Sequence, residues 1–148
     1  MRTDVGCFMD AGTHDLAIIE YLFSPGRIID VRGANLDEFT GVSVRFENGL
    51  FAHLVISWVA PEKVRRITIV GAHGSAVLDD RKEKDKLQLF SQALPLVPAI
   101  DLNEPLKNEL EHFIHCVHTG QTPLTDITFG CRVTEMCDII LRGLERQA

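Results

Sequence analysis

The stretch that decides the fold runs from residue 40 to residue 59 and reads TGVSVRFENGLFAHLVISWV. In its first half, Val42, Val44 and Phe46 alternate with other residues, which is the period of a β-strand. The Asn48-Gly49 pair tolerates the positive φ angles of a tight hairpin turn. We therefore predict two antiparallel strands, near residues 40–46 and 50–59.

The second strand of this hairpin is largely apolar on both faces. One face carries Ala52, Leu54, Ile56 and Trp58, and the other carries Phe51, His53, Val55, Ser57 and Val59. Strands that are apolar on both sides are typical of sheets covered on both faces. We expect helices over one face. The other face is covered either by another subunit or domain, or only in part by loops.

Outward from the hairpin, the period of two extends from Arg27 to about Ile100, and helical patterns flank it. Further strands are expected near 66–70, 75–78 and 86–90, with a turn at residues 71–74. Helices are expected over residues 10–23, 105–119 and 126–146, with Asp10 able to cap the first. This order predicts an α+β fold, a mostly antiparallel sheet with helices on one face and the other face available for oligomerisation.

The length, charge and cysteine spacing of the chain exclude several classes of protein. The chain has 148 residues, and its 15 basic against 21 acidic residues give a net charge of −6. The length suits a single domain spanning residues 1–148. The acidic balance argues against nucleic-acid binding and against an anionic membrane surface, and no apolar run approaches the roughly 20 residues that span a bilayer. The four cysteines form no C-x-x-C pair, so we expect free, buried thiols and a cytoplasmic protein.

Asp10 and His14 form the first candidate site. On a helix they lie one turn apart on the same face, with Tyr21 nearby. An imidazole accepts a proton near neutral pH, and a carboxylate can orient it or hold a substrate hydroxyl. Taken alone, the pair is better explained as an N-cap aspartate beside an incidental surface histidine.

A second cluster could suggest a metal. The run from Glu111 to His118 places His112, His115, Cys116 and His118 at helical spacing. The apolar stripe of that helix separates these side chains, so we predict no metal site.

The segment from Cys7 to Asp15 resembles the D-x-G-x-H-D segment of the Gfo/Idh/MocA oxidoreductases, the glucose–fructose oxidoreductase and inositol dehydrogenase family. The resemblance continues, in the same order, through nearly the whole chain. It includes the hairpin Phe46 to Gly49, the Ser57-Trp58 strand end, the turn from Ile69 to Gly74, Pro105 to Phe113, and Gly120 to Asp126.

The resemblance implies a C-terminal domain of the dihydrodipicolinate-reductase-like type, normally preceded by a Rossmann domain that binds NAD or NADP. It implies that His14 is the acid/base for a substrate hydroxyl and that Asp10 positions a sugar, polyol or nucleotide-sugar, with Tyr21 as a weaker substrate contact. It also implies a homodimer or tetramer assembled through the open sheet face.

This sequence departs from the family pattern in two informative ways. No G-x-G-x-x-G follows a first strand, so we expect that the Rossmann domain is absent, that no cofactor-binding residue is present and that the chain alone is inactive. Many members carry a second Asp three residues after the His, where this sequence has Ala17. The alternative hypothesis is a stand-alone, non-catalytic module that dimerises or binds a small ligand.

Overall fold

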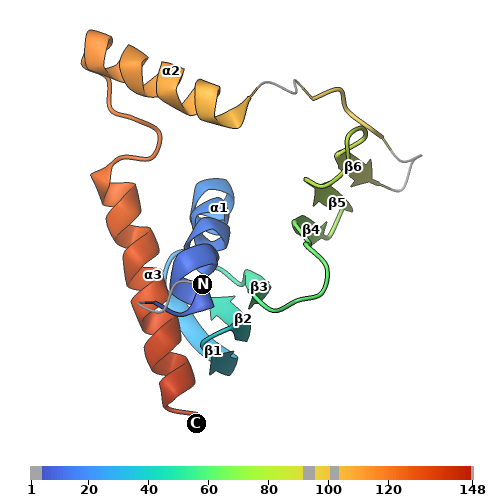
Figure 1. Cartoon of the computed structure of the whole chain (residues 1–148), viewed down its shortest axis with the longest axis vertical. Coiled ribbons are helices and arrows are strands. Elements are labelled where there is room, and N and C mark those ends of the chain that lie inside the picture. Colours follow the sequence, from blue (N-terminus) through green and yellow to red (C-terminus); the bar gives the residue numbers. More distant parts are fainter. Residues whose placement is uncertain (1–4, 92–95, 101–103, 148) are drawn as a thin grey trace. The chain divides into compact units, whose positions relative to one another are not determined.

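The computed structural model describes residues 5–91, 96–100 and 104–147 (Figure 1). Its elements follow one another as η1 (Phe8–Gly12, π-helical), α1 (Thr13–Phe23), β1 (Ile28–Leu36), β2 (Phe39–Phe46), β3 (Phe51–Ser57), β4 (Arg66–Gly71), β5 (Gly74–Asp79), β6 (Leu87–Phe90), α2 (Pro105–Thr119) and α3 (Ile127–Glu145). The predicted α+β order is confirmed, and α2 and α3 begin and end within a residue of their expected bounds.

The strands form two antiparallel sheets rather than the single sheet that the sequence predicts. One sheet has the order β1-β2-β3 and the other the order β4-β5-β6. The break coincides with residues 58–65, which include Pro61, a residue with no N–H to donate to a strand ladder. The chain accordingly divides into two compact units, the first made of Met1–Ala60 with Thr122–Ala148 and the second of Pro61–Gln121.

The hairpin that was predicted first is the centre of the first unit. Val42 pairs with Leu54 and Val44 with Ala52, so these four side chains point to the same face of the sheet. At the turn, Gly49 adopts a φ of 89°, and the Asn48 side-chain oxygen accepts a hydrogen bond from the backbone N–H of Leu50 at 3.0 Å. The Asn-Gly turn is confirmed, and it fixes the register of the sheet.

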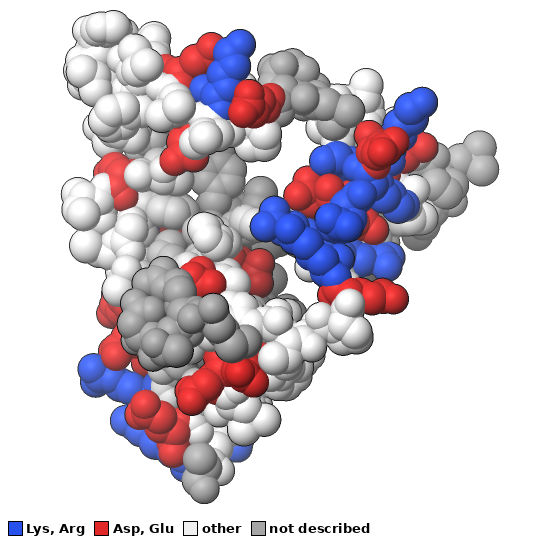
Figure 2. All heavy atoms as spheres, in the orientation of Figure 1, with Lys and Arg blue, Asp and Glu red and all other residues white. Residues whose placement is uncertain are grey.

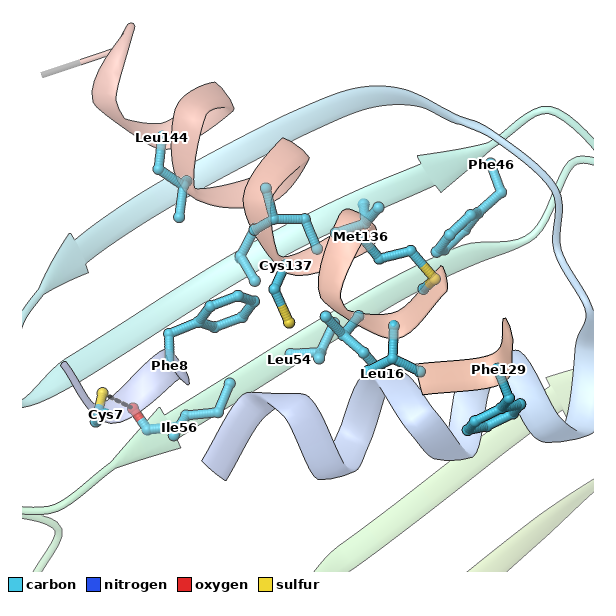
Figure 3. Packing of buried hydrophobic residues seen from close by; sticks show 14 residues of the cluster. Cys7, Phe8, Leu16, Phe46, Leu54, Ile56, Phe129, Met136, Cys137 and Leu144 are labelled. Atoms are coloured by element: carbon cyan, nitrogen blue, oxygen red, sulfur yellow. Dashed lines mark hydrogen bonds between the residues drawn. The ribbon is translucent and has the colours of Figure 1, made fainter. Parts of the chain in front are cut away.

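Helices α1 and α3 and the η1 turn cover one face of this sheet, as predicted. The buried cluster includes side chains from all of these elements, and Figure 3 shows most of them between the sheet and the two helices. The members are Cys7, Phe8, Leu16, Val42, Val44, Phe46, Leu54, Ile56, Phe129, Val133, Met136, Cys137, Ile140 and Leu144. On the opposite face, Phe51 and Val55 stay 65% and 60% exposed.

The second unit contains the β4-β5-β6 sheet and α2. The turn at residues 71–74 joins β4 to β5 as predicted. Figure 2 shows Lys and Arg side chains gathered over β4–β6 and interspersed with acidic ones. Helix α2 begins at Pro105 and ends at Thr119, followed by the C-cap Gly120, whose φ is 70°. Among the described residues, none of the helices combines the length and the apolar character needed to cross a bilayer.

Candidate functional site

The site begins with a π-helical turn. The sequence predicted a helix starting at Asp10, but the helix starts at Phe8, with Cys7 as its N-cap residue, so the prediction of Asp10 as the cap is wrong. The cause is the burial of Phe8, whose ring folds over Gly12. A Cβ at Gly12 would lie 2.8 Å from that ring. Single π-helical turns within α-helices occur frequently at functional sites.

Cys7 links this turn to the sheet through hydrogen bonds. Its backbone N–H donates to the carbonyl of Asp37 at 2.6 Å, and its thiol lies 3.5 Å from the Thr40 hydroxyl. The thiol also donates to the carbonyl of Ile56 at 3.7 Å, the contact drawn in Figure 3. These contacts join the turn to segments thirty or more residues away in sequence. The position of Asp10 is therefore set by the sheet as well as by its own helix.

Asp10, His14 and Tyr21 all lie on the segment where they were predicted. Asp10 is half-buried inside η1, and its Oδ2 accepts a hydrogen bond from Nε1 of Trp58 at 3.2 Å. His14 is exposed in the first turn of α1, and its imidazole forms no hydrogen bond within the described part of the chain. Tyr21 is exposed two turns further along the same helix. The site thus presents an accessible imidazole close in sequence to a fixed carboxylate.

Asp15, next to His14, is a further titratable residue of this segment. Burial raises the pKa of the Asp15 carboxyl above its ordinary value of 3.8, and the neighbouring His14 acts in the opposite direction. Titratable groups perturbed by burial beside a histidine are typical of functional sites. The available signal was the position of Asp15 next to His14 in the quoted family segment.

We expect Asp15→Asn to change the pH dependence of stability. A carboxyl whose pKa is raised on folding stabilises the fold while both states are protonated, and this contribution is lost as the pH rises through the folded-state pKa. The variant should match the wild type below about pH 3.8 and be more stable at pH 7. Urea denaturation at both pH values measures this. Equal stability of the two proteins at pH 7 would contradict it.

A groove of about 440 Å³ lies at the other end of α1. Glu20, which is buried, forms an ion pair there with Arg132 at 2.6 Å, and Ser24, Arg27 and Met136 also line the groove. Asp10, His14 and Tyr21 are not among its lining residues. The predicted site residues therefore lie outside this groove, on the surface of the first unit.

The clustered His and Cys side chains and the Gly71–Gly74 turn bear on metal and dinucleotide binding. Within the described residues, no three His, Cys, Asp or Glu side chains come together to hold a metal. Gly71 and Gly74 flank a turn between two antiparallel strands, not a turn that opens a helix. A dinucleotide fingerprint needs the second arrangement, so this turn is not such a fingerprint.

A protein-family model matches about half of this chain. A model of the GFO/IDH/MocA C-terminal domain matches residues 2–77. Among curated proteins, no sequence match was found.

Several solved structures share the fold. UDP-N-acetylglucosamine 3-dehydrogenase GnnA from Acidithiobacillus ferrooxidans is 21% identical with a TM-score of 0.87, over 97% of this chain and 49% of that one. The aldose-aldose oxidoreductase from Caulobacter crescentus, in complex with glycerol, is 18% identical with a TM-score of 0.78, over 97% and 47%. The WlbA dehydrogenase from Bordetella pertussis, in complex with NADH and UDP-GlcNAcA, is 18% identical with a TM-score of 0.73, over 98% and 44%. The chain therefore spans about half the length of these proteins.

Proposed function

The chain belongs to the GFO/IDH/MocA family, matching its C-terminal domain, and from this premise we propose that it is the substrate-binding and catalytic half of an NAD(P)-dependent oxidoreductase. The substrate would be a hydroxyl of a sugar, a polyol or a nucleotide-sugar. Two similar structures support a sugar or nucleotide-sugar, since one is a UDP-N-acetylglucosamine 3-dehydrogenase and another holds NADH and UDP-GlcNAcA. In this proposal residues 1–148 act as one domain.

The observation that carries the proposal is the placement of Asp10 and His14. His14 is accessible at the start of α1, where its imidazole can take the proton of a substrate hydroxyl. Asp10 is held within η1 and can accept a hydrogen bond from a neighbouring hydroxyl. The exposed Tyr21 lies further along the same helix and can contact the rest of the sugar.

Oxidation of an alcohol removes a proton from oxygen and a hydride from carbon. In this proposal the residues of this chain accept the proton only, because the hydride requires a cofactor as its acceptor. The turn from Gly71 to Gly74 does not open a helix as a dinucleotide fingerprint does, so in this proposal the nicotinamide is supplied by a separate nucleotide-binding half. We therefore expect the chain alone to be inactive as a dehydrogenase.

The proposal is tested by calorimetric titration of the chain with UDP-N-acetylglucosamine. Hydrogen bonds to charged groups contribute about 1.5–3 kcal/mol, so Asp10→Asn should weaken binding about tenfold. A matched control is Asp138→Asn, which alters an exposed carboxylate paired with Arg142 on α3 and should leave affinity unchanged. Equal affinities of the wild type and Asp10→Asn would remove Asp10 from the site.

We also propose a homodimer or tetramer assembled through the outer face of the β1-β2-β3 sheet. Phe51 and Val55 are exposed there, on the face away from α1 and α3. Exposed apolar side chains grouped on one face are typical of contact surfaces. Phe51→Glu should convert the assembly to a monomer, because it places a charge in an apolar contact. Light scattering at micromolar concentration measures the mass, and a monomeric wild type would contradict the assembly.

A cytoplasmic location completes the proposal. All four cysteines are free thiols, of which Cys7, Cys116 and Cys137 are buried as predicted, while Cys131 is exposed. Burial raises the pKa of Cys137 to about 11, which keeps that thiol protonated and unreactive. Free thiols are typical of proteins from reducing compartments.

A further inference from the structure

One hydrogen-bond donor to Asp10 lies directly after a strand of the sheet. Trp58 directly follows β3, and its Nε1–H donates to Oδ2 of Asp10 at 3.2 Å, across 48 residues of sequence. We propose that Trp58 is a positioning residue: it holds the Asp10 carboxylate in one orientation toward the substrate hydroxyl and acts on the substrate only through Asp10. This inference rests on the proposed function, in which Asp10 binds that hydroxyl.

Trp58 is itself held at two points. Its backbone N–H donates to the carbonyl of Glu38 at 2.9 Å, and its side chain packs against the buried cluster. A tryptophan can serve both purposes because it has an apolar body and a single N–H donor. The indole therefore has one direction in which to donate, and Asp10 lies there.

Asp10 depends on such a partner because of where it lies. It is inside the π-helical turn and not at the start of the helix, so its carboxylate is not the N-cap that the sequence predicted. An aspartate side chain has two rotatable bonds and a choice of staggered rotamers. A charge-assisted hydrogen bond to a rigid indole selects among these rotamers. The η1 turn sets the backbone of Asp10, and the hydrogen bond from Trp58 restricts the direction of its carboxylate.

The contact can be observed directly, since Trp58 is the only tryptophan of the chain. An ¹⁵N–¹H spectrum therefore contains one indole signal. We expect Asp10→Asn to displace this signal at neutral pH, because the indole N–H then faces a neutral amide instead of a carboxylate. Asp138→Asn, which alters an exposed carboxylate on α3, should leave the signal in place. An indole signal that does not respond to Asp10→Asn would overturn the inference.

A double-mutant cycle tests positioning, using calorimetric binding of UDP-N-acetylglucosamine. Trp58→Phe keeps an aromatic ring but removes the indole N–H donor. We expect it to weaken binding about tenfold in the wild-type background and to have little effect in the Asp10→Asn background, because hydrogen-bonded neighbours are not additive. An equal loss in both backgrounds would overturn the positioning role, since a general loss of structure would act in both. Thermal unfolding of each variant checks that the comparison is between folded proteins.

The two experiments separate the inference from the function on which it rests. If the indole signal follows Asp10 but the folded wild type binds no UDP-N-acetylglucosamine, the proposed substrate is wrong, and the positioning role for it is overturned as well. If the chain binds the nucleotide-sugar but the indole signal ignores Asp10, the proposed function stands and only the role of Trp58 is overturned.

Discussion

Phe8→Ala is expected to destabilise the first unit by about 3–5 kcal/mol, the usual cost of removing a buried phenylalanine ring. Phe8 is 1% exposed, and its ring points toward Cys137 of α3 from the η1 turn (Figure 3). A domain of this kind is stable by about 5–15 kcal/mol, so the loss is a large part of the total. Asp10 belongs to the same turn. In the variant, this turn should therefore lose its structure before the rest of the core unfolds.

The fluorescence of Trp58 during urea denaturation measures this loss, because the only tryptophan lies in the first unit. The matched control is Ile127→Ala, which removes an apolar side chain that is 82% exposed at the start of α3. The control should change stability by less than about 0.5 kcal/mol. If both variants unfold at the same urea concentration, the turn does not depend on Phe8.

His14→Ala should lower the turnover of the completed enzyme about 10²- to 10⁴-fold, the usual contribution of a general acid or base. The assay requires this chain together with a nucleotide-binding half, because we expect the chain alone to be inactive. His14 is exposed and makes no hydrogen bond to other described residues, so its loss should leave stability nearly unchanged. The effect should appear in kcat more than in KM.

The control for this variant is His73→Ala, which removes an exposed imidazole from the turn between β4 and β5. It should retain wild-type turnover. Activity of His14→Ala within threefold of the wild type would assign proton transfer to another group.

The local elements of this fold could be predicted from the sequence. Alternation of Val42, Val44 and Phe46 and the Asn48-Gly49 turn specify the central hairpin, because strand period and turn chemistry are properties of adjacent residues. For the same reason the positions of Pro105 and Gly120 predicted the ends of α2.

The contacts that shape the site could not be predicted this way. The bond from Trp58 to Asp10 and that from the Cys7 thiol to Ile56 each span more than forty residues. No periodicity relates residues so far apart, because their contact depends on how the elements pack. The π-helical turn and the division of the strands into two sheets also depend on packing. The first accompanies the burial of Phe8, and the second follows the break after Trp58.

The most direct test of the account is a calorimetric titration of the folded chain with NADH and NADPH, followed by UDP-N-acetylglucosamine. The central claim is that this chain is the substrate half of a GFO/IDH/MocA oxidoreductase and contains no dinucleotide site. It predicts no saturable heat with either dinucleotide, and binding of the nucleotide-sugar that weakens in Asp10→Asn. Saturable, micromolar binding of NADH or NADPH would contradict it.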